Sequence, residues 1–220
     1  MYLHRLAGPK AGRGGYTAVI VPRFDFLVES YRTEREKTLG VWSQVPDAEM
    51  GFRPDPRARS PLEHMVHQCL SEEAWMANML GITVSRPALP ATETRLEFLR
   101  RYAECSAERL AQLGAKPDDW FEAPTAFFDV TRSRAWVLVR RMMHSAHHRG
   151  QLTAYLRFWG RALYSTYGPT ADTGGLAKDG ATVIYRYPSA DDLLRAEAGG
   201  GGGVPLPGPG PQPPTERPSS

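Results

Sequence analysis

The sequence predicts an all-α protein that folds as a four-helix bundle. Four long segments carry apolar residues at helical spacing, and each is followed by a glycine or proline that can end a helix. The composition, 41% hydrophobic and 23% charged over 220 residues, is that of an ordinary globular domain with room for a core. Strand potential is confined to "ATVIYRY" at 181–187, so we expect a short irregular or β-hairpin-like C-terminal segment after the bundle.

Three of the four helices are predicted from their apolar period and from the residues that stop them. The first ends before Pro46, the third at Gly114 and the last at Gly160, while Thr92 or Thr94 is placed to cap the third. The expected ranges are about 23–44, 92 or 94–114, and 131–159, with a longer crossover over 114–130.

The remaining helix, second in the chain, has the clearest local signal. Ser60 is placed as its N-cap, Pro61 occupies the first helical position, and Glu63 completes a capping box. This helix is expected to run over 61–80 and to stop at Gly81.

The two ends of the chain differ in composition from the part between them. Residues 1–21 are rich in glycine and basic residues and are expected to form an irregular leader, followed by the bundle domain over 22–190. From residue 198 to residue 220 the chain is glycine- and then proline-rich, and it cannot bury enough apolar area to offset the entropy of ordering. We therefore expect a disordered tail there.

The charge and the cysteine content indicate which partners and which cellular compartment to expect. The net charge of +3 comes with scattered arginine pairs and no dense basic stripe, so nucleic-acid binding is the least favoured function. Cys69 and Cys105 form no disulfide framework, which fits a reducing compartment. The early apolar run "YTAVIVP" is too short for a signal peptide, and no stretch is long enough to span a bilayer. We expect a cytoplasmic protein without a membrane partner.

Half of the six histidines lie in "HSAHH" within the last predicted helix. His144 and His148 are four residues apart and share a face, whereas His147 projects about 100° away from His148. Two imidazoles at this spacing can bind one metal ion. The alternative is a polar stripe on an ordinary helix, and the pattern lacks the glutamate of the HExxH zinc motif.

A third metal ligand has to come from another helix, because inward side chains on facing helices build metal sites in bundles. The second predicted helix offers His64 and His67. Its apolar face is broad, so periodicity does not decide which of these two points inward.

Two separated motifs carry a family resemblance. "SPLEHMVHQCLSEEAW", preceded by "LGVWSQVPDAEMGFRP" and followed far downstream by "HSAHHRGQLTAYLR", resembles the DinB/YfiT-like family of metalloenzymes over about residues 22–175. The resemblance implies a divalent metal ion, zinc or nickel foremost and manganese or iron as alternatives. It also implies the ligands His67, His144 and His148, with His64 and His147 outside the site.

Four further residues are candidates for the surroundings of this site. Gln151 and Tyr155 continue the face of the two downstream histidines and give it a polar mouth. Trp75 is placed to border the pocket, although core packing is the default for a tryptophan. Glu63 shares a face with His67, but its capping-box role is favoured over a contact behind a metal ligand.

Three neighbours of the histidines are interpreted as structural. Cys69 points away from the site and is favoured as a small buried apolar residue over a nucleophile. Gly150 is expected at a close helix contact, and Arg149 as a structural or rim charge.

The resemblance also implies a chemistry. Three neutral imidazoles leave a coordination position open, as catalytic sites do. Family members with known activity use low-molecular-weight thiols, so we expect a thiol S-transferase or a related metal-activated thiol or hydrolytic reaction on a small-molecule substrate. The general base is not indicated. The rival hypothesis is a non-catalytic metal-binding stress or interaction protein with a vestigial site. Dimerisation is common in such bundles, and the sequence shows no interface for a homodimer.

Overall fold

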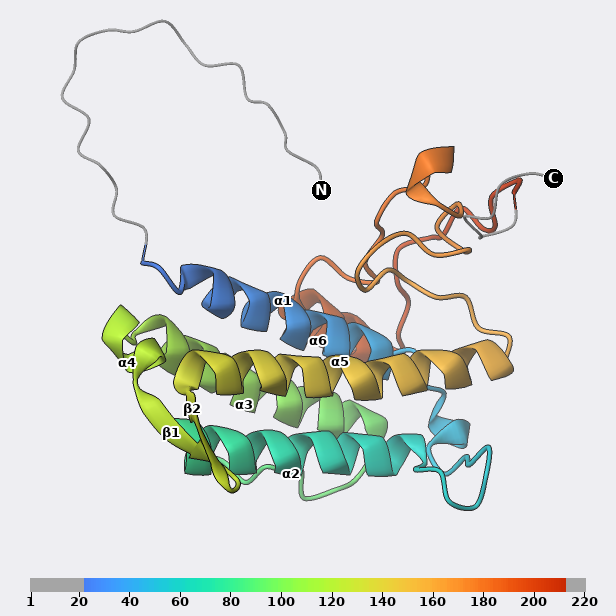
Figure 1. The fold of residues 1–220 in the computed structure, drawn as a ribbon. Coiled ribbons are helices and arrows are strands. Elements are labelled where there is room, and N and C mark those ends of the chain that lie inside the picture. The colour runs from blue at the N-terminus through green and yellow to red at the C-terminus, as the bar shows by residue number, and fades with distance from the viewer. Residues whose placement is uncertain (1–21, 213–220) are drawn as a thin grey trace, which may run out of the picture.

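The computed structural model describes residues 22–212 and confirms the all-α bundle (Figure 1). The four long helices are α1 (Asp25–Trp42), α2 (Pro61–Leu80), α3 (Arg95–Gly114) and α5 (Arg134–Phe158). Helix α1 packs against α3 and α5, and α2 packs against α5. The expected leader, 1–21, and the last residues, 213–220, lie outside the described residues. Within the described part, none of the helices combines the length and apolar character that a bilayer crossing requires.

The crossover before α5 has structure that the sequence did not predict. A short helix, α4 (Asp118–Glu122), leads into an antiparallel hairpin of β1 (Pro124–Phe127) and β2 (Val130–Ser133), which runs directly into α5. The hairpin tip includes Phe128, whose φ of 52° is uncommon for a residue with a side chain. This hairpin lies beside the C-terminal half of α2 (Figure 1).

Of the two forms expected for the C-terminal segment, irregular or β-hairpin-like, the structure has the irregular one, since residues 181–187 form no strand. The backbone of these residues makes isolated hydrogen bonds on two sides instead of one ladder: the Ser165 amide donates to the Ile184 carbonyl, and the Val204 amide donates to the Arg186 carbonyl. β-Branched residues favour a strand only where a partner strand is present, and neither neighbouring segment is extended along it.

The rest of the C-terminal part covers one side of the bundle. After the turn η2 (Ala177–Asp179), α6 (Ala190–Ala198) packs against α1 and α3. Residues 199–212, whose composition predicts disorder, contact the loop that follows α5. The Tyr164 hydroxyl donates to the Val204 carbonyl at 2.8 Å, and Thr173 bridges to Gly208.

Helix α2 begins and ends where the sequence predicts. The Ser60 hydroxyl accepts from the Glu63 amide at 3.3 Å, and the Glu63 carboxylate accepts from the Ser60 amide at 2.8 Å. Pro61 is the first helical residue, and Gly81 ends the helix with a left-handed φ of 65°. Both orphan donors at the helix start are therefore satisfied within four residues.

The Ser60 cap gives a measurable prediction. Ser60→Ala is expected to lower the free energy of unfolding by about 1 kcal/mol, because the Glu63 amide loses its acceptor. Urea denaturation followed by circular dichroism measures this loss. Ser30→Ala is the control, since the Ser30 hydroxyl bonds only to the carbonyl of Phe26 in its own helix; it is expected to change stability by less than about 0.5 kcal/mol. Equal effects for the two variants would contradict the capping role.

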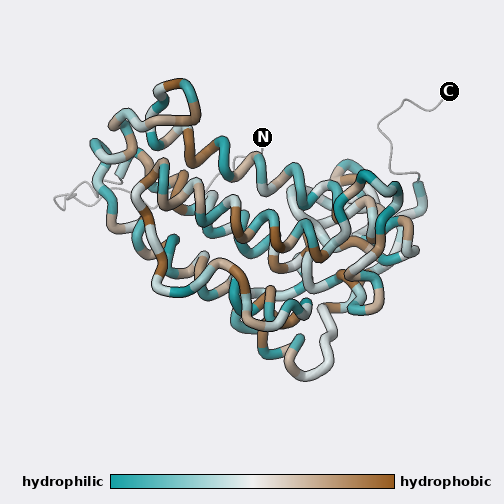
Figure 2. Tube along the Cα trace, turned by 90° about the horizontal axis from the view of Figure 1, so that it is seen from below, coloured by the Kyte–Doolittle hydropathy of each residue, from teal (hydrophilic) through white to brown (hydrophobic). Residues whose placement is uncertain are grey.

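The apolar faces of the helices build two buried clusters, and apolar and polar residues accordingly alternate along each helix in Figure 2. One cluster is centred on Trp42, Met65 and Leu152, and the other on Met76, Leu80 and Val137.

Glu72, 1% exposed, is a polar exception in this interior. Its carboxylate accepts from the hydroxyls of Tyr31 (2.6 Å) and Tyr102 (3.1 Å) and from the Arg109 guanidinium (3.4 Å). The Arg141 guanidinium lies 3.8 Å away. All four long helices thus contribute side chains to the surroundings of one carboxylate. Its ion pairs and hydrogen bonds offset the cost of burying the charge.

Candidate metal centre

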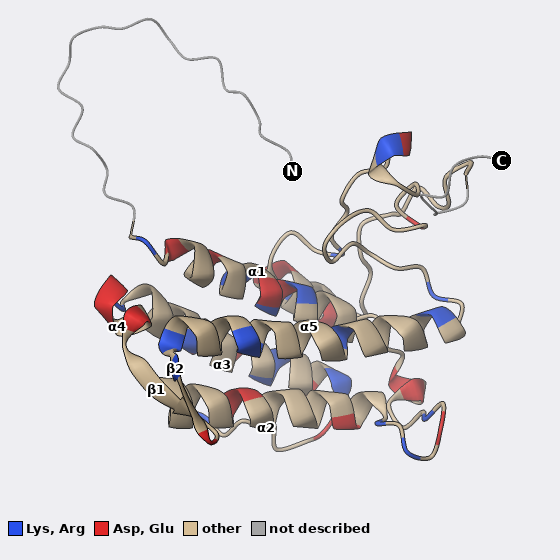
Figure 3. Ribbon diagram, viewed as in Figure 1, with Lys and Arg blue, Asp and Glu red and all other residues tan. Residues whose placement is uncertain are grey.

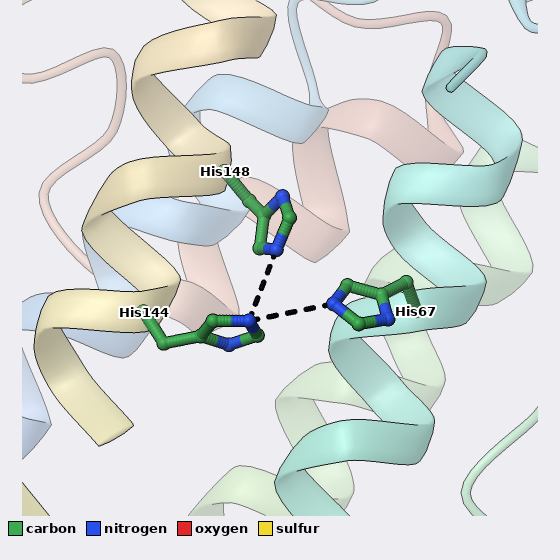
Figure 4. Close-up of side chains that lie close together, drawn as sticks. All are labelled: His67, His144 and His148. Carbon is green, nitrogen blue, oxygen red and sulfur yellow. Dashed lines mark hydrogen bonds between the residues drawn. The ribbon is translucent and has the colours of Figure 1, made fainter. Parts of the chain in front are cut away.

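Three histidines from two helices point toward one another in the seam between α2 and α5 (Figure 4). The Nε2 atom of His144 lies 3.4 Å from Nε2 of His67 and 3.2 Å from Nε2 of His148. All three donor atoms lie within 4.8 Å of one another. We refer to these residues as the histidine triad, and they are the three predicted ligands.

The spacing of these nitrogens fits a shared metal ion. Two nitrogens about 2.05 Å from one ion at the tetrahedral angle lie about 3.3 Å apart, which is close to both short distances of the triad. Three imidazoles would leave a fourth position of such an ion open, as in catalytic zinc sites. The donor set could therefore hold a divalent ion, while the identity of that ion is left open by three nitrogen ligands.

Gln151 orients one of the three rings. Its side-chain carbonyl lies 3.0 Å from Nδ1 of His148. A hydrogen on Nδ1 that donates to this carbonyl leaves the lone pair of Nε2 pointing at the centre of the triad. Of the two residues expected to give a polar mouth, Gln151 therefore contacts the triad directly.

Arg141 is a neighbour that sequence reasoning missed. Its guanidinium lies 3.0 Å from Nδ1 of His144 and also donates to Ser71 and Ser145. Because a guanidinium only donates, Nδ1 of His144 accepts, and the proton of this neutral ring sits on Nε2 between the other two rings. A neutral His144 could ligate a cation through Nε2 only with its proton on Nδ1, so metal binding would require the contact from Arg141 to Nδ1 to be released. The i−3 spacing of Arg141 from His144 was the available signal.

Aromatic side chains form one wall of the site. The Trp75 ring stacks on His144, with centroids 5.5 Å apart and planes at 18°. The edges of Phe127 and Phe128 meet Trp75 at 5.2 Å and 6.0 Å. Trp75 therefore borders the triad as predicted, and the two phenylalanines were missed because the hairpin that carries them was missed.

The other candidates lie further out. Glu63 is engaged in the capping box and an ion pair with Arg53, with no contact to the triad. The Tyr155 hydroxyl donates to the Arg59 carbonyl at 3.0 Å, and its ring meets His64 rather than the triad. His64 is buried beside the His148 ring, with centroids 5.3 Å apart.

The remaining neighbours are structural or peripheral. Cys69 is buried in the core, and burial raises the pKa of its thiol, so it is no nucleophile. Arg149 is fully buried and pairs with Glu34, which makes it structural and not a rim charge. His147 is exposed. The expected close contact at Gly150 is wrong: it is exposed, and a Cβ there would meet nothing within 4 Å, because this position of α5 faces outward.

The surroundings of the triad lower the pKa values of its three histidines and so favour their neutral forms. Burial, and next the charge of Arg141, lower the pKa of His144 to about 3. Burial lowers the pKa of His148 to about 4, and it also lowers the pKa of His67. Neutral imidazoles are the protonation state that binds metal, so near neutral pH protons compete weakly for these nitrogens.

These pKa shifts predict acid sensitivity of the metal-free protein. Between about pH 6.5 and pH 4 the unfolded chain binds protons at His144 and His148 that the folded chain does not. The free energy of unfolding is therefore expected to fall as pH drops through this window. Urea midpoints at pH 7, 6 and 5 should decline less steeply in His144→Gln than in the wild type. His147→Gln, at an exposed position, should retain the wild-type slope; three parallel slopes would contradict the prediction.

The fold and the triad together define a class, the helical-bundle proteins in which three histidines converge so that they could hold a metal ion. The chain belongs to the DinB family, whose model matches residues 22–175. Its fold is similar to that of a DinB-like protein from Bacillus cereus ATCC 10987, with a TM-score of 0.58 at 17% identity over 65% of this chain and 97% of that one. A DinB-like protein from Bacillus subtilis matches with a TM-score of 0.52 at 14% identity, over 64% and 97% of the two chains. No functionally curated protein matches the chain.

Proposed function

We propose that this protein is a divalent-metal-dependent enzyme that transfers or rearranges groups on the sulfur of a small thiol. The observation that carries the proposal is the convergence of three imidazole nitrogens, with Nε2 of His144 3.2 Å and 3.4 Å from the other two. An ion with three protein ligands would keep a fourth position for the thiol. A bound divalent ion would lower the pKa of a coordinating thiol, so that the nucleophilic thiolate is present at neutral pH. Zinc or nickel is the proposed ion.

The residues of the chain would hold and shape this centre. Gln151 fixes the tautomer of His148, and the Trp75 ring covers one face of His144 and keeps water from it. Arg141 places a positive charge behind His144 that would favour a negatively charged sulfur at the centre. A reducing, cytoplasmic setting belongs to the proposal, because the thiol substrate has to stay reduced.

A second candidate is a metal-binding protein without catalytic activity, acting in stress response or in an interaction. It is favoured by one observation: in the part of the chain that the structure describes, no carboxylate pairs with or hydrogen-bonds to a histidine of the triad. A general base for a hydrolytic reaction is therefore not supplied by an acidic side chain in contact with the ligands.

Turnover separates the two candidates. The zinc-loaded and the nickel-loaded protein are each given a panel of small thiols with chlorodinitrobenzene as electrophile, and thioether formation is followed by absorbance. The proposal expects turnover that requires the metal, is lost in His67→Ala and persists in His147→Ala, whose side chain is exposed outside the triad. Stoichiometric metal binding without turnover by any thiol would favour the second candidate.

A further inference from the structure

The seam between α2 and α5 has a defined order of side chains on either side of the triad. At one end Phe128 contacts Trp75, and Trp75 stacks on His144. At the other end His148 contacts His64, whose ring meets Tyr155. The Tyr155 hydroxyl holds the backbone of Arg59. The triad therefore sits between an aromatic end and an end that carries an arginine.

Arg59 is placed to act on a ligand. It lines a cavity of about 450 Å³ that also contains His67, and a second one of about 370 Å³ that contains His64, Gln151 and Tyr155. Two other arginines of the same loop form ion pairs, Arg53 with Glu63 and Arg57 with Asp55. Within residues 22–212, no carboxylate lies within 4 Å of the Arg59 guanidinium. Basic residues of this loop before α2 are visible in Figure 3.

The backbone of Arg59 is held in place, while its side chain is exposed. Its carbonyl accepts from Tyr155, a core residue that is 7% exposed, and the next residue, Ser60, caps α2. A guanidinium that lines a cavity and has no carboxylate partner suits a ligand carboxylate, which it can bind through two parallel hydrogen bonds.

The aromatic end has the opposite chemistry. Phe128 is 71% exposed and keeps a left-handed φ of 52° at the hairpin tip, so a large apolar side chain is presented to solvent beside Trp75. Backbone strain of this kind is retained where the surroundings impose it, and it collects at ligand-binding positions. Packing of a planar group against Trp75 and Phe128 would bury this surface.

We propose that the thiol taken by this site carries a planar apolar group on one side of its sulfur, packed against Trp75 and Phe128, and a carboxylate on the other side, paired with Arg59. The inference rests on the proposed function, because it names the substrate class of the same centre. It assigns the selectivity to residues outside the metal ligands: Arg59 from the loop before α2, and Phe128 from the hairpin.

The test uses binding rather than turnover. The cobalt-loaded protein is titrated with β-mercapto-γ-phenylbutyrate, which has sulfur between a benzyl group and a carboxylate, and the sulfur-to-cobalt absorption band is recorded. Two analogues are compared with it, the carboxamide and β-mercaptobutyrate, which lacks the phenyl ring. The parent acid is expected to bind at least about tenfold more tightly than either analogue, as loss of a charge-assisted hydrogen bond or of an aromatic contact implies.

Variants assign each preference to its residue. Arg59→Gln is expected to bring the acid-to-amide ratio close to one while the phenyl preference remains. Phe128→Ala is expected to remove the preference for the phenyl-bearing thiol while the acid-to-amide ratio remains. Arg140→Gln is the matched charge control, because Arg140 acts electrostatically on His144 but lines neither cavity. Phe158→Ala is the control for an exposed phenylalanine elsewhere.

The possible failures are distinguishable. An acid-to-amide ratio that survives in Arg59→Gln, or falls equally in Arg140→Gln, overturns the role of Arg59. A phenyl preference that survives in Phe128→Ala overturns the role of the hairpin. Equal binding of all three thiols to the wild type ends the inference and leaves the proposed function standing. If none of the thiols changes the cobalt spectrum, the proposed thiol chemistry falls as well.

Discussion

Replacing His144 with alanine is expected to lower the affinity for Zn²⁺ or Ni²⁺ by about 100-fold or more, since loss of a ligand exceeds the 10–100-fold cost of losing a group behind a ligand. His144 lies within 3.2 Å and 3.4 Å of the other two donor nitrogens and joins them into one centre. Without it, two imidazoles from different helices remain, which is too few for a tight site. Competition with a chromophoric chelator measures the affinity, and elemental analysis measures the bound metal.

The control for this prediction is His147→Ala. His147 lies three residues from His144 on the same helix, is exposed, and is not one of the convergent donors. Its removal is expected to leave both the affinity and the bound metal unchanged. If His144→Ala binds metal as tightly as His147→Ala does, the triad is no metal site and the proposed function fails with it.

Glu72→Ala is expected to lower the free energy of unfolding by about 3–5 kcal/mol, the cost of removing one partner from a buried ion pair. Arg109 and Arg141 would remain in the core without their carboxylate, and the hydroxyls of Tyr31 and Tyr102 would lose their acceptor. Urea denaturation followed by far-ultraviolet circular dichroism measures the change. Glu72→Gln keeps an acceptor and should lie between the wild type and the alanine variant.

Glu73→Ala is the matched control, because Glu73 is the next residue of α2 and is not fully buried. It is expected to change stability by less than about 0.5 kcal/mol. A loss below about 1 kcal/mol in Glu72→Ala would show that the four-helix contact at this carboxylate is not a major source of stability.

The long helices could be predicted because their signals are local. Ser60, Pro61, Glu63 and Gly81 set both ends of α2 through contacts within a few residues, and the structure keeps all of them. The hairpin could not be predicted in the same way. Its tip is Phe128-Asp129 instead of the Asn-Gly or Asp-Gly pairs that mark hairpins, and Phe128 has a left-handed φ there while its ring contacts Trp75 and Phe127.

The candidate site likewise has a part that local sequence signals predict and a part that they do not. The i,i+4 spacing of His144 and His148 determined from the sequence alone that these two side chains share a face, because helix geometry fixes that relation. The choice of His67 over His64 came from the resemblance, since the apolar face of α2 is too broad for periodicity to decide. The rotation of α2 against α5 brings His67 to the pair and leaves His64 in the core.

The environment of the three histidines depends on the tertiary structure. Arg141 meets both His144 and the four-helix contact at Glu72, and Trp75 is covered by a hairpin that follows it by about fifty residues. Such contacts depend on how whole helices are set against one another, which is the result of packing the entire core. Local signals specify the helices and the shared face of His144 and His148. The packing of the core places His67 beside them, together with the charged and aromatic groups around all three.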